Sequence, residues 1–312
     1  MGQVFMAKHR LLRRPTAIKL LPQEKAGAQA ITRFEREVQL TACLTHPNTV
    51  SIFDYGRSVD GVFYYAMEYL EGIDLASLVH EYGAQPLGRV VHILQQVCNS
   101  LGEAHRHGLI HRDIKPANII LTTQGGEPDF VKVVDFGLVK ELGSDVQVTL
   151  AGGLSGTPAY LAPECITDPE TVDARADLYA LGATAYFLIT GSNVFLGETV
   201  VAVLSQHLYA EPEPPSLRLA APIDARFEAL VLQCLAKMPS ERPQTAGEVR
   251  DRLRALLPHE SWSEATAADW WKAWKLARTA PARSFASDGG HLTVGLRERP
   301  SAVRARSKQD AL

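Results

Sequence analysis

The chain of 312 residues has 46% hydrophobic and 21% charged residues, which is typical of a globular protein with a sizeable core and more than one domain. Its formal net charge of -3 gives no electrostatic basis for binding nucleic acid. Four scattered cysteines and the lack of an apolar signal region predict a cytoplasmic protein with reduced thiols. The most apolar stretch, Leu178 to Ile189, is too short to span a bilayer and predicts a buried helix instead.

The first elements along the chain are mainly strands. Residues 1–21 predict two strands, because apolar runs flank a basic turn. A helix follows, since apolar residues recur at helical spacing through residues 31–42. Residues 49–69 predict two more strands around a turn at Asp60-Gly61, and Glu71-Gly72 indicates a hinge between two lobes.

The middle of the chain predicts a long helix and then a charged loop. Arg89 to His107 is amphipathic over its whole length, and Gly108 ends the helix. Leu109-Ile110 is predicted as a short strand leading into the loop at residues 111–118. Residues 122–128 predict an enlarged hairpin turn.

The C-terminal part predicts helices and then a tail. A capping box at Thr245 and Glu248 begins the last helix of the large lobe. All four tryptophans follow, within Trp262 to Trp274, and residues 263–278 predict a helix. We expect this helix to pack on the large lobe, while docking to a partner or lying at a membrane surface is the alternative. Residues 281–312 have few large apolar side chains and are expected to be disordered.

Three oxygen-bearing side chains carry the chemical signal. Asp113 and Asn118 are separated by four residues, so a tight loop can present both at one point. Asp135, close to Gly137, opens a second loop that we expect on the other side of the same cleft. Such a set can hold divalent cations and accept a proton from a hydroxyl, which is what phosphoryl transfer requires.

These loops resemble the catalytic loop and the Asp-Phe-Gly loop of eukaryotic-type protein kinases, and their motifs are specific. Residues 111–118 read HRDIKPAN, residues 135–137 read DFG, and residues 156–164 read GTPAYLAPE. The sequences at residues 46–49, 175–179 and 237–243 are most similar to bacterial Ser/Thr kinases of this type.

The resemblance implies an α+β, bilobal fold. A small β-rich lobe would occupy residues 1–70 and a large helical lobe residues 71–257. A tryptophan-rich helical extension at residues 258–280 and the tail at residues 281–312 lie beyond it.

The resemblance also implies an ATP site roofed by the small lobe. Lys19 would pair with the α and β phosphates, and Glu37 would hold this lysine in place. Gly2 and Val4 match only the end of the glycine-rich loop, whose first two glycines and preceding strand are missing. Either the protein begins upstream of this start, or the roof over the nucleotide is incomplete.

Six further residues are implied in adenine and ribose binding: Ala17, Met67, Glu68, Leu70, Asp74 and Ile120. Among them, Ala17 and Ile120 would sandwich the adenine, and Met67 would close the back of its pocket. The backbone at Glu68 and near Leu70 would pair with the adenine edge, while Asp74 would meet the ribose.

The implied catalytic groups are few. Asp113 would orient the substrate hydroxyl and take its proton late in the transfer, for which an ordinary carboxylate pKa suffices. Lys115 would neutralise charge on the γ-phosphoryl group, and Asn118 and Asp135 would ligate Mg2+. Thr157 would lie near Asp113 and favour Ser/Thr substrates.

The activation segment implied at residues 138–164 has a glycine-rich middle, as a regulated loop requires. Arg112 supplies a cation that can pair with a phosphate on this segment, and Thr149 and Ser155 are the candidate phosphorylation sites. The sequence therefore predicts a Ser/Thr protein kinase that autophosphorylates, with a dimer as the means of doing so in trans. The alternative is a pseudokinase, a folded binding module with an incomplete glycine loop.

Three supporting roles complete the prediction. We expect His111 to support Phe136 rather than to react, and Asp177 to cap the backbone of the catalytic loop. Arg242 should form a buried ion pair with Glu164.

Overall fold

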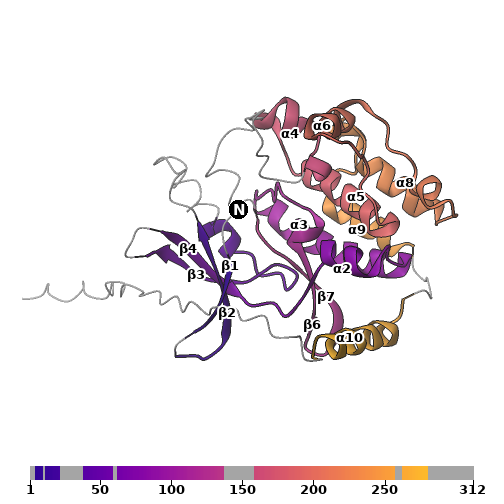
Figure 1. Cartoon of the computed structure of the whole chain (residues 1–312). Helices are drawn as coiled ribbons and strands as arrows, with labels where there is room; N and C mark the ends of the chain where they lie inside the picture. Colours follow the sequence, from indigo (N-terminus) through magenta and orange to yellow (C-terminus); the bar gives the residue numbers. More distant parts are fainter. Residues whose placement is uncertain are drawn as a thin grey trace, which may run out of the picture.

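The computed structural model describes residues 4–9, 11–21, 38–58, 62–136, 158–256 and 262–279. These residues form two lobes of unequal size, a small one built on a β-sheet and a larger one built mainly of helices (Figure 1). The predicted α+β, bilobal fold is confirmed.

The small lobe is a four-stranded antiparallel sheet with the strand order β1-β2-β4-β3. Its strands match the four that the sequence predicts: β1 (Val4–Lys8), β2 (Pro15–Leu21), β3 (Ile52–Arg57) and β4 (Phe63–Glu68). The register places Lys19 opposite Tyr65 and Ala17 opposite Met67. Residues 38–42 are helical, as predicted, whereas the earlier part of that helix lies outside the described residues.

The large lobe begins with a second, three-stranded sheet and two helices. These elements are β5 (Gly72–Asp74), α2 (Leu75–Tyr82), α3 (Leu87–Arg106), the 3-10 turn η2 (Pro116–Asn118), β6 (Ile119–Gln124) and β7 (Glu127–Val133). The strand order of this sheet is β5-β6-β7. The catalytic loop leads into the middle strand β6, and the Asp-Phe-Gly loop follows the strand β7.

Two local predictions were wrong in this region. The hairpin turn consists only of Gly125 and Gly126, both at positive φ, because the polar residues around them continue the strand pairing. Leu109-Ile110 forms no strand, since the N–H of Leu109 donates to the carbonyl of Ala104 and so closes helix α3.

The remaining elements cover the large lobe with helices. They are η3 (Pro158–Tyr160), α4 (Glu164–Thr167), η4 (Pro169–Thr171), α5 (Arg175–Thr190), α6 (Val200–Tyr209), α7 (Pro215–Leu219), α8 (Ala225–Cys234), η5 (Pro239–Glu241) and α9 (Ala246–Arg254). Helix α5 contains the apolar run of residues 178–189 and is buried as predicted, between α3 and α8. No helix in the described ranges is long and apolar enough to cross a bilayer.

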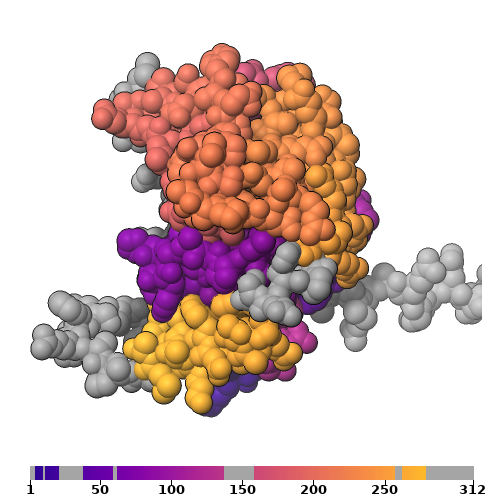
Figure 2. Space-filling model, turned by 90° about the vertical axis from the view of Figure 1, so that its right-hand side faces the viewer, coloured from indigo at the N-terminus to yellow at the C-terminus, as the bar shows by residue number. Residues whose placement is uncertain are grey.

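The tryptophan-rich helix α10 (Glu264–Thr279) packs on the large lobe against β7 and α2 (Figures 1 and 2). Trp271 and Trp274 are buried in the main core of that lobe. The prediction that the helix packs on its own chain is thus confirmed, and these two side chains are not left for another partner.

The contact between α10 and the lobe centres on Asp129, which is fully buried at the start of β7. The Asp129 carboxylate accepts from both Nε and Nη2 of Arg89, at 3.0 and 2.7 Å. It also accepts from Nε1 of Trp262 at 2.8 Å and of Trp271 at 2.9 Å. The Arg89 guanidinium lies 4.4 Å from the ring centre of Trp262 and 4.1 Å from that of Trp270. We call these five residues the Asp129 cluster.

Candidate active site

The backbone of the catalytic loop is held by Asp177, the third residue of α5. Its carboxylate accepts from the backbone N–H groups of His111 and Arg112, both at 2.8 Å, and contacts His105 Nε2 at 2.8 Å. Burial acts to raise the pKa of Asp177, but the hydrogen bond and charge of His105 and the contacts with His111 together lower it. Asp177 therefore remains charged, and its predicted role as a cap of this loop is confirmed.

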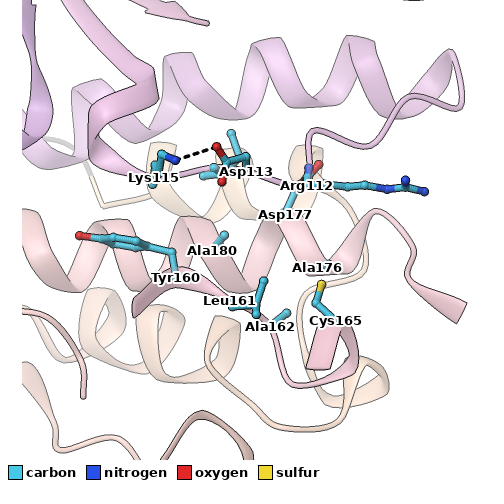
Figure 3. Close-up of a pocket in the computed structure, with 11 residues that line it drawn as sticks. Arg112, Asp113, Lys115, Tyr160, Leu161, Ala162, Cys165, Ala176, Asp177 and Ala180 are labelled. Carbon is cyan, nitrogen blue, oxygen red and sulfur yellow. Dashed lines mark hydrogen bonds and ion pairs between the residues drawn. The ribbon is translucent and has the colours of Figure 1, made fainter. Parts of the chain in front are cut away.

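The predicted catalytic residues of the loop lie together. Lys115 Nζ is 2.7 Å from Asp113 Oδ2, an interaction drawn as a dashed line in Figure 3. The Asn118 amide nitrogen donates to the same oxygen at 2.9 Å. Asn118 also donates to the Asp113 carbonyl at 2.8 Å. Because its amide nitrogen is held twice, Asn118 has its amide oxygen available as the atom that suits a cation.

Asp135 connects this loop to the small lobe. Its Oδ2 lies 2.5 Å from Lys19 Nζ, and its Oδ1 accepts from the Tyr65 hydroxyl at 2.8 Å. The Asp135 side chain is 26% exposed, whereas Lys19 and Tyr65 are buried. Two strands of one lobe thus meet a carboxylate of the other lobe at a single point.

Tyr65 was not predicted as a site residue from the sequence. It stands in an aromatic strand segment that reads as ordinary core, and its partner is 70 positions away in the chain. Burial, and then the nearby Asp135 carboxylate, raise the pKa of Tyr65 well above its ordinary value. The phenol is therefore protonated and acts as a donor.

His111 packs against the Asp-Phe-Gly loop, as predicted. Its ring centre lies 4.5 Å from that of Phe136, and its Nε2 is 3.0 Å from the carbonyl of Val134. The Asp113 N–H donates to His111 Nδ1, which assigns the proton to Nε2. Burial lowers the pKa of His111, so the neutral ring holds the two loops together.

Most residues predicted to contact adenine lie in one apolar group between the lobes. Ala17 and Met67 are buried side by side across the β2–β4 register, and Leu70 and Ile120 pack against the same small-lobe core. The Glu68 side chain accepts from Lys132 Nζ and the Ser51 N–H, and the Glu68 N–H donates to the Ser51 carbonyl. The adenine contact predicted at Glu68 uses neither of these groups but its backbone carbonyl.

Two other predicted nucleotide contacts lie in different surroundings. Asp74 caps helix α2, where its carboxylate accepts from the N–H groups of Ala76 and Ser77 and from the Ser77 hydroxyl. This capping role was not predicted from the sequence. Val4 lies opposite Lys19 on β1 and is 55% exposed.

Five predicted residues lie outside the described part of the chain: Gly2, Glu37, Thr149, Ser155 and Thr157. Arg112 is described and has φ of 61°, a backbone conformation in which Asp177 can accept from its N–H group.

A hollow beside the catalytic loop is shared by the loop, the end of the activation segment and α5 (Figure 3). The catalytic loop contributes Asp113 and Lys115, and the opposite wall contains Tyr160 and Leu161. The wall is held in place by the ion pair that the sequence predicted, in which Arg242 donates to both oxygens of Glu164 at 2.6 and 2.7 Å. Arg242 is 2% exposed and the Glu164 side chain 12% exposed, so the arginine end of the pair is buried.

The metal ligands available here are oxygens. Within the described ranges, no group of three or more His, Cys, Asp or Glu side chains could hold a metal ion. Asn118 and Asp135 fit Mg2+, which keeps several waters and is bound through one or two protein oxygens together with substrate phosphates.

Comparison with known proteins agrees with this geometry. Residues 1–253 match the model of the protein kinase domain. The chain is 39% identical over 261 residues to the serine/threonine-protein kinase pkn3 of Myxococcus xanthus, covering 82% of this chain and 48% of that protein. It is 37% identical over 276 residues to PknB of Mycobacterium leprae (strain TN), covering 86% and 43%. The chain thus spans less than half the length of these relatives.

Solved structures show the same fold. The Mycobacterium tuberculosis PknI kinase domain superposes with a TM-score of 0.63 at 29% identity, covering 82% of this chain and 91% of that one. Rad53 1-466 in complex with AMP-PNP superposes with a TM-score of 0.67 at 26% identity, covering 80% and 61%. On the family match and these identities, the chain belongs to the protein kinase family.

Proposed function

We propose that this chain is a Ser/Thr protein kinase that uses ATP and Mg2+ to phosphorylate hydroxyls of protein substrates. The observation that carries the proposal is the meeting of Lys19 with Asp135, beside the group formed by Asp113, Lys115 and Asn118. The two groups lie on neighbouring segments, because the Val134 N–H donates to the Asn118 carbonyl at 3.0 Å. A cation for phosphates, oxygens for a metal and a carboxylate for a hydroxyl proton are the set that phosphoryl transfer needs.

Each residue has a separate task in the proposed reaction. Lys19 exchanges Asp135 for the α and β phosphates when the nucleotide enters. Asp113 orients the substrate hydroxyl and accepts its proton, and Lys115 offsets the negative charge of the phosphoryl group in transit.

Asn118 and Asp135 would hold Mg2+, because their oxygens are the hard ligands that this ion prefers. When bound, the ion neutralises charge on the nucleotide phosphates. The apolar group of Ala17, Met67 and Ile120 supports an adenine site between the lobes.

Regulation by autophosphorylation belongs to the same proposal. Arg112 is the cation that would pair with a phosphate on Thr149 or Ser155, and Thr157 would favour Ser/Thr substrates. A dimer would allow phosphorylation in trans, and the reaction would take place in the cytoplasm.

The test is phosphate transfer from labelled ATP to the chain itself and to a generic protein substrate, followed by analysis of which residue types carry the label. We expect label on Ser and Thr, and Asp113→Asn should reduce transfer by about 100-fold or more while nucleotide binding persists. Thr149→Ala should lower activity, and a rate that rises with protein concentration would support phosphorylation in trans. The exposed Asp251→Asn is the matched control. Nucleotide binding without transfer in the wild type would refute the enzyme and indicate a binding module.

A further inference from the structure

The Tyr65 hydroxyl contacts the carboxylate of Asp135 together with Lys19. Tyr65 donates to Oδ1 at 2.8 Å, and Lys19 Nζ lies 2.5 Å from Oδ2. Each carboxylate oxygen therefore has its own donor. The two donors stand on paired strands, since Lys19 and Tyr65 lie opposite each other in the β2–β4 register.

The two donors differ in how freely they can move. The Tyr65 ring is 1% exposed and belongs to the small-lobe core with Val38, Val50 and Val134. Val134, which directly precedes Asp135, belongs to the same core cluster, so the ring is buried in the core that also holds the residue next to Asp135. A ring packed this tightly keeps its hydroxyl at one point at little further cost in conformational entropy.

Lys19, by contrast, has a flexible four-carbon stem and a second partner in the proposed reaction, the nucleotide phosphates. When Lys19 turns to the phosphates, it releases Oδ2 of Asp135. Tyr65 remains hydrogen-bonded to Oδ1, because its buried ring does not move when Lys19 Nζ moves to the phosphates. The carboxylate then has one oxygen fixed and one oxygen open on a side chain that is 26% exposed.

We propose that Tyr65 is a positioning residue that holds Asp135 Oδ1 and thereby presents Oδ2 to Mg2+. This inference rests on the proposed function, which assigns Asp135 to the metal. Hydrogen-bond partners that orient metal-ligating carboxylates contribute about 10- to 100-fold to metal affinity or activity, which sets the size of the effect to expect.

The experiment measures how strongly Mg2+ and nucleotide promote each other's binding, with the full chain and AMP-PNP as the probe. Calorimetry gives the Kd of AMP-PNP in EDTA and in saturating Mg2+. We call the Kd in EDTA divided by the Kd in Mg2+ the metal coupling. Tyr65→Phe removes only the hydroxyl and should lower this ratio about tenfold while the Kd in EDTA stays within about twofold. The Mg2+ concentration for half-maximal kinase activity should rise in parallel.

Two variants make the result specific. Tyr64→Phe removes the hydroxyl of the neighbouring buried tyrosine, whose side chain points to the other face of the sheet, and should leave the coupling unchanged. Tyr65→Met also lacks the hydroxyl but fills the apolar site differently, so it should reproduce the loss seen with Tyr65→Phe and replaces that variant if it folds poorly.

Asp135→Asn separates this inference from the proposed function. If Asp135→Asn abolishes the coupling and both Tyr65 variants keep it, Tyr65 does not position the metal ligand and the inference fails alone. A higher coupling in Tyr65→Phe would also overturn it, because Tyr65 would then mask the carboxylate. Full coupling in Asp135→Asn would instead refute the proposed metal site.

Discussion

Asp129→Asn is expected to destabilise the large lobe strongly, although the two side chains have nearly the same shape. The Asp129 carboxylate accepts two hydrogen bonds from Arg89 and one each from Trp262 and Trp271. Each carboxylate oxygen accepts from one Arg89 nitrogen and one tryptophan. An asparagine replaces one of these oxygens by an NH2 group, so one arginine N–H and one tryptophan N–H would lose their acceptor. It also leaves the Arg89 guanidinium, which is 1% exposed, without its counter-charge.

The magnitude follows from the burial of the pair. Removing one partner of a buried, hydrogen-bonded ion pair costs about 3–5 kcal/mol, because the other charge remains buried and uncompensated. The whole free energy of unfolding of a protein is about 5–15 kcal/mol, so this loss is a large share of it. For a folded unit of 150–250 residues, the size range of the large lobe, it corresponds to a fall in Tm of roughly 6–20 °C.

The assay can follow the cluster directly, because all four tryptophans of the chain lie between Trp262 and Trp274. Intrinsic tryptophan fluorescence therefore reports only on this segment. Asp129→Asn should shift the emission to the red and make it easier to quench, at a temperature where circular dichroism still shows a folded chain. Thermal melts by both methods give the loss of stability.

Asp251→Asn is the matched control, since it removes the same charge from an exposed pair with Arg250, worth about 0–1 kcal/mol. The reasoning is refuted if Asp129→Asn and Asp251→Asn melt at the same temperature. It is also refuted if Asp129→Asn melts lower while its tryptophan emission stays unchanged in the folded chain, because the cluster would then not hold α10 in place.

Three further substitutions test other parts of the structure. Glu164→Gln should lose about 3–5 kcal/mol in chemical denaturation, because it leaves the buried Arg242 without its carboxylate. His207→Gln should reduce the loss of stability between pH 6.5 and about 4, since burial, and then the charge of Lys237, lower the pKa of His207 to about 4. In that range the unfolded chain takes up the proton first, so falling pH destabilises the wild type, which thermal melts at several pH values would measure. Gly72→Ala should lower the Tm and weaken nucleotide binding, because the new Cβ would stand 2.0 Å from the Leu121 carbonyl oxygen in the β5–β6 pairing.

Each of these three substitutions has a control substitution that should have little effect in the same measurement. Asp173→Asn removes a half-exposed carboxylate from its pair with Arg175, and a loss equal to that of Glu164→Gln would contradict the first expectation. The exposed His92→Gln should leave the acid slope intact, so an equal change in both histidine variants would exclude His207 as its source. A Cβ at Gly102 on helix α3 would meet no atom within 4 Å among the described residues, apart from those of its own helix turn, so Gly102→Ala should not share the defect of Gly72→Ala.

The sequence predicted the parts of the site whose geometry is local. Asp113 and Asn118 stand in one short loop, so their spacing alone brings them together. Asp177 lies 65 positions from Arg112, and its role as a cap could be predicted only through the resemblance to protein kinases. Strand and helix positions were also predictable where apolar residues repeat with a clear period. The pairing of Lys19 with Asp135 was not, because it depends on how the two lobes close on each other.

Tyr65 and Asp129 were missed for a related reason. Tyr65 lies in an apolar strand, where a tyrosine is normally explained by packing, and its partner is distant in sequence. Asp129 stands beside a glycine turn, where an acidic residue normally indicates a solvent-exposed loop, and its partner Arg89 is 40 positions away. In both cases the polar group is explained only by a partner that the fold brings to it.

The Asp129 cluster and the cleft share one strand, which raises the question of whether they are coupled. Strand β7 begins two residues before Asp129 and ends two residues before Asp135, and its Lys132 is 2.8 Å from Glu68 at the hinge. A shared strand does not by itself create coupling, since a ligand shifts an equilibrium only if it binds two states differently. If the cluster holds β7 equally in the free and bound forms, Asp129→Asn should lower the Tm but leave the Kd of AMP-PNP unchanged in the folded chain. We expect this result, because β7 is also anchored by its pairing with β6 along nearly its whole length, independently of α10. A Kd raised about tenfold below the melting range would show instead that helix α10 helps to set the nucleotide-binding state of the cleft.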